Sequence, residues 1–439
     1  MANSYLNKTF GTPTDTKKYT MSVWVKRATL GVQQSIARST NGNDDSHVFT
    51  FNSDDTLRWD EYGSSSTIGT LKTNRKFRDI SAWYHVVLWY DSANSTAGDR
   101  MRMWINGVEE TSFATDTNPS LNADSAFNKA SQPINIGRTS YSGGGNYFDG
   151  YLAHMAFVDG ANVAHTTFGE TDSTSGIWKF KSPSGITWGT NGFHLKFENS
   201  GNLGLDSSSN ASNWTVNGNL TQSVDTPSIN YVTLNPLLSS GSGQVTHSRA
   251  NTRTGTGNGI TYLTMMPTTG KWFCEFHFQT AGAGQDNGIG FWSVPEAQTI
   301  AFYSSGFKGI VWKYAGNVYV NGSNNAFSSN TFTSGDIISV AMDMDNSTAT
   351  FYKNGSVATN LNAYSFPFTE REAISVGIMD GANASAEDGI FDFNSGANGT
   401  FGGRKTAGGN SDANGQGDFS MAVPSGYYAL NTKNLNTYG

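Results

Sequence analysis

Two segments of this chain share one pattern. In each, a strand-like run leads through a turn rich in Asn, Asp and Ser into an alternating run that ends at Asn-Gly. The two segments are Ala82–Gly107 and Asp336–Gly355. Because Asn-Gly readily adopts the positive φ angles of a type I′ turn, each segment predicts an antiparallel hairpin. The repetition in opposite halves of the chain predicts two antiparallel β domains in tandem.

Composition supports this all-β interpretation. The chain has 439 residues, enough for two or three domains that each bury a core, and two is the better count. It contains 50 glycines and 13% aromatic residues but only 14% charged residues, a balance typical of a turn-rich β protein with few helices. A disordered chain would carry far fewer aromatic residues.

Charge and cysteine content exclude several classes of function. The net charge of −7 argues against a nucleic-acid partner, which would require a basic face. The single Cys274 rules out an internal disulfide framework and a multi-cysteine zinc site. The first twenty residues lack the apolar core of a signal peptide, and no window reaches the roughly 18 apolar residues of a membrane span. We therefore expect a protein that is made in a cytosol and not inserted into a membrane.

Short strand-like runs separated by turn residues predict sandwiches rather than alternating βα units. We expect a first sandwich over residues 1–223, a linker at 224–237, a second sandwich at 238–394 and a Gly/Asn-rich tail at 395–439. The segment 168–218 belongs to the first domain in this interpretation, because an unpacked linker would not need Trp178, Trp188, Phe193 and Trp214. The stretch 395–418 is poor in aliphatic residues, which predicts that it is flexible or ordered only against another surface.

An ordered series of motifs in the first half resembles the laminin-G-like branch of concanavalin A-like jelly rolls. The resemblance covers residues 1–220 and is carried by Ser22–Arg27, Trp83–Val87, Trp104–Val108, Ile136–Arg138, Tyr147–Ala153 and Asp159–Gly160. The second half resembles a SPRY-type sandwich through Gly270–Glu275, Gly288–Gly290, Gly335–Asp336, Val340–Asp343 and Phe351–Gly355. The implied fold is two tandem antiparallel β-sandwiches, a jelly roll followed by a SPRY-like sandwich.

The combination is similar to large proteins of marine bacteriophages, whose sandwiches are joined by segments like Gly192–Phe197, Asp225–Pro227 and Leu430–Leu435. This resemblance implies a virion structural protein, made in the host cytoplasm and displayed on the particle with other virion proteins as partners. Two roles are open. The first is host attachment by a tail fibre or appendage that binds surface polysaccharide and forms a homo-oligomer, a trimer in the case of a fibre. The second is capsid decoration through the termini. A polysaccharide depolymerase is a third, less favoured alternative.

No catalytic motif accompanies either domain, so we expect no enzyme activity. Retaining glycosidases need two carboxyl groups about 5 to 5.5 Å apart in one cleft. The nearest acidic cluster, Asp60-Glu61, places its side chains on opposite faces of a strand because successive side chains alternate. The histidines form no HExxH pattern, and no Gly-X-Ser-X-Gly elbow occurs.

No cofactor is required, but calcium is a candidate because laminin-G-like modules often hold one calcium ion at the sandwich rim. Calcium takes six to eight oxygen ligands. Oxygen-rich loops supply the candidate ligands, which are Asp91, Asn94, Asp99, Asp343 and Asp345. The alternative is that these side chains only bond their own turn backbone.

Sugar binding by β-sandwiches relies on an exposed aromatic ring beside polar groups that bond hydroxyls. The candidates combine both chemistries and are Trp59, Tyr62, Arg138, Tyr141, Tyr147, Tyr303, Trp312 and Tyr314. The alternative is that the aromatic residues belong to the sandwich cores.

Overall fold

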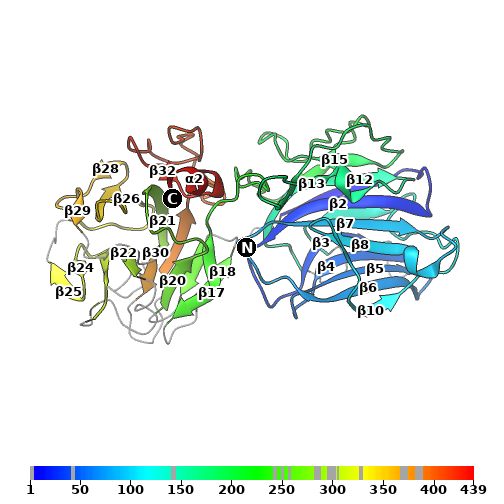
Figure 1. Ribbon diagram of the computed structural model, residues 1–439, viewed down its shortest axis with the longest axis horizontal. Coiled ribbons are helices and arrows are strands. Elements are labelled where there is room, and N and C mark those ends of the chain that lie inside the picture. Colours follow the sequence, from blue (N-terminus) through cyan, green and yellow to red (C-terminus); the bar gives the residue numbers. More distant parts are fainter. Residues whose placement is uncertain are drawn as a thin grey trace. The chain divides into compact units, whose positions relative to one another are not determined.

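The computed structural model describes residues 4–40, 45–139, 145–240, 245–248, 252–255, 259–280, 288–293, 303, 306–325, 330–365, 374–380 and 389–439. The chain divides into two compact units, Met1–Gln222 and Ser223–Gly439 (Figure 1). Both units consist of antiparallel sheets, which confirms the predicted all-β fold with two tandem sandwiches. No helix among these residues is long and apolar enough to cross a membrane.

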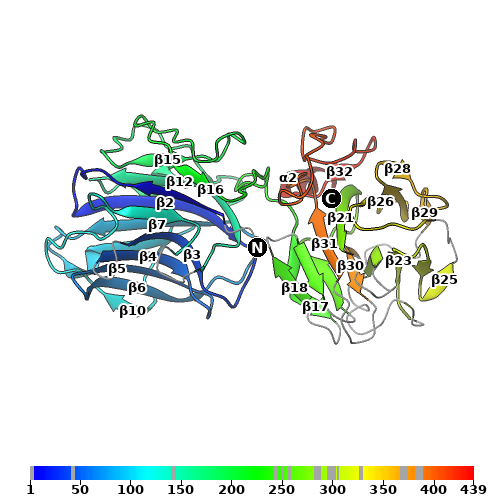
Figure 2. The same cartoon turned by 180° about the vertical axis from the view of Figure 1, so that it is seen from behind.

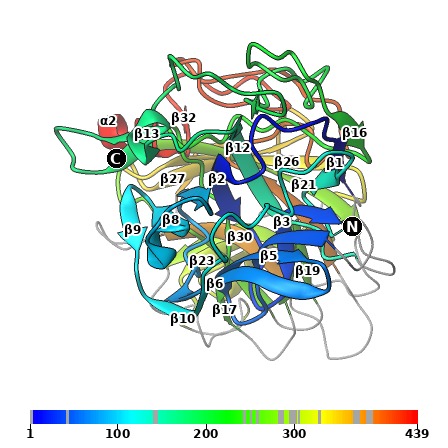
Figure 3. The same ribbon diagram turned by 90° about the vertical axis from the view of Figure 1, so that its right-hand side faces the viewer.

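Unit 1 is a sandwich of an eight-stranded and a six-stranded sheet. The first has the order β10-β6-β5-β4-β3-β11-β1-β16 and the second the order β15-β12-β2-β7-β8-β9. Figure 3 shows β2 and β12 in one layer of unit 1 and β5 and β6 in the other. The strands are β1 (Tyr5–Thr9), β2 (Lys18–Arg27), β3 (Gln34–Thr40), β4 (Asp45–Phe51), β5 (Thr56–Gly63), β6 (Ser66–Lys76), β7 (Tyr84–Asp91), β8 (Met101–Ile105), β9 (Val108–Glu110), β10 (Phe113–Thr117), β11 (Pro133–Ile136), β12 (Gly150–Asp159), β13 (Gly169–Thr171), β14 (Trp178–Phe180), β15 (Phe193–Leu195) and β16 (Thr215–Asn217).

The core of unit 1 is formed by alternate residues of both sheets. On β2, Met21, Val23 and Val25 are buried in it, and on β5 Leu57 and Trp59 are buried in it. This alternation follows from the two-residue period of a pleated strand. The residues between them therefore face outward from the sandwich.

The segment after β12 covers the outer face of the six-stranded sheet. Its β13–β14 hairpin places Trp178 against His85 of β7, and the Trp178 indole Nε1 donates to His85 Nδ1 at 3.0 Å. His85 in turn stacks on Trp24 of β2 with ring centroids 4.6 Å apart. The aromatic residues of this segment thus pack on unit 1, which is the role the sequence predicted for them.

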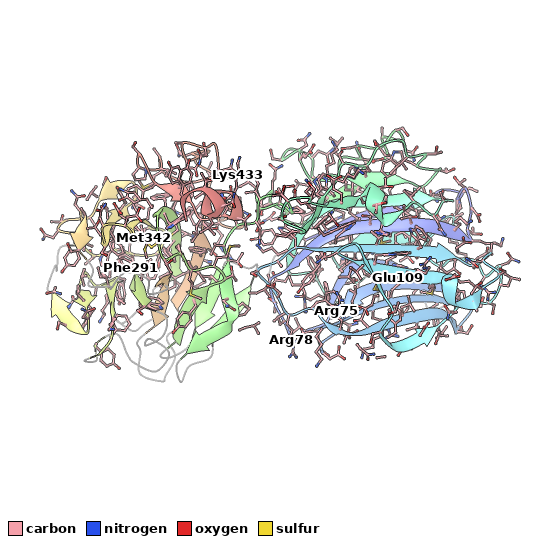
Figure 4. All side chains as sticks on the ribbon, in the orientation of Figure 1. Arg75, Arg78, Glu109, Phe291, Met342 and Lys433 are labelled. Carbon is pink, nitrogen blue, oxygen red and sulfur yellow. The ribbon has the colours of Figure 1, made fainter. Side chains whose placement is uncertain are left out.

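Unit 2 also contains two sheets. The seven-stranded sheet has the order β17-β20-β30-β22-β23-β24-β25, and the larger sheet has the path β18-β19-β31-β21-β26-β27-β28 with β29 and β32 paired to β27 and β21. The buried residues Phe291 and Met342 are labelled in Figure 4. The strands are β17 (Leu234–Ser240), β18 (Val245–Ser248), β19 (Thr252–Gly255), β20 (Gly259–Leu263), β21 (Lys271–Thr280), β22 (Gly288–Ser293), β23 (Gly309–Lys313), β24 (Val318–Val320), β25 (Ser323–Asn325), β26 (Ile337–Asp343), β27 (Thr348–Lys353), β28 (Ser356–Val357), β29 (Tyr364–Ser365), β30 (Ile374–Asp380), β31 (Gly389–Asn394) and β32 (Tyr428–Ala429), and the chain ends in helix α2 (Thr432–Tyr438).

The predicted linker and tail are both parts of unit 2. Tyr231 and Val232, placed in the linker by the sequence, are buried in unit 2. The C-terminal segment 395–429, red to brown in Figures 1 and 2, lies beside β21, and β32 pairs with β21 in parallel. Phe419 of this segment packs on Phe273 with ring centroids 5.0 Å apart. Of the two alternatives predicted for this stretch, flexible or ordered only against another surface, the structure shows the second: a few aromatic anchors order a segment that has hardly any aliphatic residues.

Both Asn-Gly dipeptides form the predicted hairpins. Asn106 and Gly107 have φ of 49° and 78°, and Asn354 and Gly355 have φ of 48° and 83°. These are the positive angles of a type I′ turn. The two hairpins differ in their surroundings, because Trp178 packs directly on Gly107.

This difference predicts unequal effects of the same substitution. A Cβ at Gly107 would lie 2.4 Å from Trp178 Cε3, whereas a Cβ at Gly355 would have Met421 Cβ at 3.8 Å as its nearest neighbour. Both Gly→Ala changes place Ala in the left-handed region, which costs about 1 kcal/mol. Only Gly107→Ala adds overpacking, which costs about 1–3 kcal/mol more. Urea denaturation of the two variants measures the free energies of unfolding, and equal losses would contradict the packing role of Gly107.

Candidate functional site

The outer face of the eight-stranded sheet carries a polar row that crosses every strand. On β5, Trp59 and Glu61 face the core, so Asp60 faces outward. The strand register then fixes its neighbours on the same face. From β10 to β16 the row consists of Thr117, Thr70, Asp60, Val48, Arg38, Asn135, Asn7 and Thr215. Amide, hydroxyl and charged groups from strands far apart in sequence are thus aligned on one surface.

The acidic group of this row is neutralised by a neighbour on its own strand. Arg58 donates Nε to Asp60 Oδ1 at 2.9 Å, and its second nitrogen lies 2.7 Å from Asp60 Oδ2. This two-point geometry orients both side chains. Tyr62, two residues further along β5, is half-buried on the same face. Of the predicted sugar-binding residues on β5, Tyr62 is therefore available to a ligand.

An aromatic and cationic cluster lies beside the row. The Arg138 guanidinium is 3.8 Å from the ring centroid of Tyr5, and the Tyr5 and Tyr147 rings are 6.5 Å apart. Tyr5 is two residues from Asn7 on β1, so both face outward. The structure thus brings the predicted Arg138 and Tyr147 together and adds Tyr5, which the sequence analysis missed. The sequence signal that could have identified Tyr5 is its two-residue spacing from Asn7 in the first strand.

Arg138 has a particular electrostatic setting. Among the residues that the structure describes, no carboxylate lies within ion-pair distance of its guanidinium. Its Nε is buried and has no hydrogen-bond partner in the described part of the chain. Arg102, on the six-stranded sheet, also packs on an aromatic ring but is paired with Glu109. Arg138 therefore has donor capacity left for a ligand.

Four of the other predicted contact residues do not join this cluster. Trp59 and Trp312 are fully buried in the cores of units 1 and 2, so their assignment to ligand contact is corrected. Tyr314 stacks on Phe278 at the edge of the unit 2 core, and Tyr303 is 49% exposed. Strand alternation and the packing of the sheets turn the side chains of these two tryptophans into the cores. Composition alone could not reveal which face of the sheet they lie on. Tyr141 lies outside the described residues.

The two neighbouring carboxylates Asp60 and Glu61 do face opposite sides of β5, as the sequence predicted. Glu61 is completely buried in the core, where Tyr19 donates its hydroxyl at 2.6 Å and the Ala126 amide donates at 2.7 Å. Burial, together with the Glu61 charge, raises the pKa of Tyr19 well above its usual value. Because the two carboxyl groups face different environments, they cannot act together on one sugar.

A serine and a histidine that are hydrogen-bonded on the six-stranded sheet also lack the geometry of a catalytic pair. Ser22 Oγ lies 2.8 Å from His85 Nε2, and Trp178 donates its indole N–H to His85 Nδ1. Nδ1 therefore accepts, and Nε2 carries the proton and donates to Ser22. Burial lowers the pKa of His85 to about 3, which keeps the ring neutral. This tautomer cannot take a proton from Ser22.

The first candidate calcium loop is already occupied by basic side chains. Lys18 Nζ lies 3.1 Å from Asp91 Oδ2, and the Asn94 side chain accepts from the Thr96 amide. Arg100 donates to the backbone oxygens of Asn94 at 2.8 Å and Pro119 at 2.9 Å. Asp99 ends the short 3-10 helix 97–99. Lys18 and Arg100 thus hold Asp91 Oδ2 and the Asn94 backbone oxygen, whereas Asp91 Oδ1 is buried without a hydrogen-bond partner in the described chain.

The second candidate loop is similar. Lys271 Nζ lies 2.7 Å from Asp343 Oδ2, and Asn346 bonds both oxygens of Asp343. Asp345 accepts from the Gly270 amide at 2.9 Å. Within the described ranges, no group of three or more His, Cys, Asp and Glu side chains is placed to hold a metal ion. The residues present in these two loops do not fit a calcium site.

Residues 2–166 match the Concanavalin A-like lectin/glucanases superfamily, which covers less than half of the chain. No curated protein matches the chain. The chain is therefore similar to this superfamily over most of unit 1.

Solved structures with similar folds include modules from several organisms. The SPRY domain of human HERC1 is 19% identical and is covered over 96% of its length by 36% of this chain, with a TM-score of 0.29. A Ruminococcus gnavus sialidase CBM40 bound to sialyllactose is 13% identical, with 35% of this chain and 89% of that chain covered and a TM-score of 0.25. Domains LG4-5 of the mouse laminin alpha1 chain are 11% identical, with 89% and 79% covered and a TM-score of 0.29.

The basic occupants of the candidate calcium loops predict that calcium does not stabilise this protein. We expect the melting temperature to be the same in excess calcium and in EDTA. Arg100→Ala should instead lower stability by about 2 kcal/mol, because carbonyl groups lose a charged donor. Differential scanning calorimetry of both proteins checks this expectation. A rise in melting temperature of the unsubstituted protein upon calcium addition would show that a metal binds after all.

Proposed function

We propose that this chain is a non-enzymatic glycan-binding protein and that the outer face of the eight-stranded sheet in unit 1 is its binding surface. The observation that carries the proposal is the cluster of Arg138, Tyr5 and Tyr147 beside the amide groups of Asn7 and Asn135. The match of residues 2–166 to a superfamily of lectins and glucanases supports the same ligand class.

The chemistry of this surface suits a sugar. A sugar ring has apolar C–H faces that pack on an aromatic ring, and its hydroxyl groups need directional donors and acceptors. Asn7 and Asn135 lie directly opposite each other on neighbouring strands, and each amide both donates and accepts. Asn217 donates to Asn7 at 2.7 Å, which fixes the orientation of that amide. The surface therefore offers aromatic rings and the exposed, oriented amide of Asn7, with the largely buried Asn135 beside it.

Binding to a glycan array tests this proposal. We expect the full chain to bind a subset of glycans, and we expect Arg138→Ala to weaken that binding about tenfold or more, since a charged donor contributes roughly 1.5–3 kcal/mol. Arg102→Ala is the matched control, because Arg102 also packs on an aromatic ring but lies on the other sheet and is paired with Glu109.

Tyr62→Ala should also reduce binding, because Tyr62 lies on the same face as Asp60. Equal losses in Arg138→Ala and Arg102→Ala would indicate a general loss of folding. Undiminished binding in both Arg138→Ala and Tyr62→Ala would move the site elsewhere.

The finer part of the proposal is that the protein acts in a bacteriophage particle, most simply in host attachment through surface polysaccharide, as a homo-oligomer with other virion proteins as partners. Its support is the resemblance of the two domains and their joining segments to marine phage proteins. Capsid decoration is the second candidate. It would use the termini, particularly the 395–418 stretch and the tail to Gly439, but the 395–418 stretch lies on a sheet of its own unit. Decoration would therefore need another surface.

Gold-labelled antibody on intact particles distinguishes these roles. We expect label at the tail end, as host attachment requires. Label spread over the head would favour decoration instead. Particles without label would remove the virion assignment and leave the glycan-binding proposal to stand on the array result alone. Particles from a phage that lacks this protein are the control for antibody specificity.

A further inference from the structure

A buried carboxylate lies at the centre of the outer face of the large sheet in unit 2. Glu275 of β21 is directly opposite Ser339 of β26 and Asn394 of β31. All three are completely buried, because the C-terminal segment crosses this face. Ser420 and Met421 of that segment lie against the carboxylate. Glu275 is thus enclosed between a sheet and the segment that covers it.

The hydrogen bonds of Glu275 come from neutral donors of the covering segment and of the neighbouring strand. The Ser420 amide donates to Oε2 at 2.9 Å, the Met421 amide to Oε1 at 3.2 Å, and Asn394 Nδ2 to Oε2 at 3.3 Å. An ionised carboxylate has about four acceptor positions. The Ser420 amide also lies 3.1 Å from Oε1, so it is shared between the two oxygens. The hydrogen-bond donors of Glu275 in the described chain are thus all neutral groups, and none of them balances the charge of an ionised carboxylate.

A cavity of about 240 Å³ opens at this point. It is lined by Glu275, Ile337, Ser339, Asn354, Gly355, Ser420 and Met421. Ser339 Oγ is buried and has no hydrogen-bond partner among the described residues. Residues directly opposite on antiparallel strands have Cβ atoms about 4.5–5.5 Å apart, so Glu275 and Ser339 can reach the same small group. The cavity thus combines a buried carboxylate whose donors are all neutral with an unpartnered hydroxyl.

The electrostatic setting of Glu275 favours a positively charged ligand. Burial raises the pKa of Glu275 to about 7, although its hydrogen bonds act in the opposite direction. A nearby cation would favour the ionised carboxylate. Other titratable groups on or against this face are already paired with each other: His277 and Arg404 both contact Asp392, and Lys271 contacts Asp343. The face also carries Tyr352, Tyr427 and Asp418. In the described chain, no lysine or arginine forms an ion pair with Glu275.

We propose that this cavity binds a small primary ammonium group, held by the Glu275 carboxylate and the Ser339 hydroxyl. An ammonium group has three donors and no acceptor, which matches the oxygen atoms that line the cavity. Ile337 and Met421 provide apolar walls for the carbon attached to the nitrogen. This site lies in unit 2 and is independent of the glycan-binding surface proposed for unit 1.

The proposal makes binding dependent on pH. Below the pKa of about 7, Glu275 is protonated in the free protein, so an ammonium ion must displace a proton. Affinity should therefore rise about tenfold per pH unit from pH 5 towards pH 7 and become constant above it. A neutral ligand would show no such gain.

Calorimetric titration of the full chain with ethanolamine tests the proposal. We expect binding at pH 8, weaker binding at pH 6, and the release of about one proton per ligand at pH 6, measured in two buffers of different ionisation enthalpy. 1-Propanol, which has a similar size but no charge, should not bind. Glu275→Gln should abolish binding, and Ser339→Ala, which keeps the carboxylate, should weaken it roughly tenfold.

Glu198→Gln is the matched control, because the Glu198 side chain is 65% exposed in unit 1 and should have no effect. Circular dichroism establishes whether each variant is folded. If Glu275→Gln does not fold, Ser339→Ala alone decides the question. Equal affinities of the unsubstituted protein and a folded Glu275→Gln or Ser339→Ala variant would overturn the proposal. So would equal binding of 1-propanol, or no ethanolamine binding at pH 8, which would leave only water in the cavity.

Discussion

The alternation of side chains across a pleated strand decides which groups of this protein can meet a ligand. β5 shows this most clearly: Leu57, Trp59 and Glu61 enter the core, whereas Asp60 and Tyr62 face outward. A shift of one residue in register would exchange the two sets. The inward residues stabilise the sandwich by burial, and the outward residues are left for recognition. The binding surface proposed for unit 1 is therefore a consequence of how its core is filled.

The outer faces of the sheets are used in different ways. The six-stranded sheet of unit 1 is covered by the segment that contains Trp178, which fills the space above Gly107 and bonds His85. The large sheet of unit 2 is covered by the C-terminal segment through Phe419 and the backbone of Ser420. The eight-stranded sheet carries the aligned polar row instead. Covering segments thus bury the outer faces of the six-stranded sheet and of the large sheet of unit 2. The outer face of the eight-stranded sheet carries the polar row and is the surface proposed for recognition.

Two buried carboxylates illustrate how the same device has different chemical consequences. Glu61 and Glu275 are both completely buried, and both accept hydrogen bonds from the backbone of a crossing segment. The Tyr19 hydroxyl and His47 Nδ1 lie at 2.6 and 3.0 Å from Glu61 Oε1, so Glu61 is surrounded by partners of the core. Glu275 instead lines a cavity beside an unpartnered hydroxyl. The different roles proposed for Glu61 and Glu275 therefore depend on the free volume beside each carboxylate and on the hydrogen-bond donors around it. Burial itself does not distinguish the two.

Local patterns determined much of the fold. The Asn-Gly hairpins, the β class, the packing of the aromatic segment after β12 and the opposite faces of Asp60 and Glu61 all follow from turn chemistry and the two-residue period, which act over a few residues. The same patterns could not place the 395–418 stretch, because its order comes from a few contacts such as Phe419 on Phe273, distant in sequence.

The sequence by itself also supplied the chemistry of the candidate site, since Tyr62, Arg138 and Tyr147 were recognised by residue type. Only the tertiary structure decided which candidates meet: it buried Trp59 and Trp312, brought Tyr5 to Arg138, and set Lys18 and Arg100 against the oxygens of the presumed calcium loop. The physical reason is that strand register and loop packing join residues over long separations, and these long-range contacts determine which polar groups remain unsatisfied and can bind a ligand.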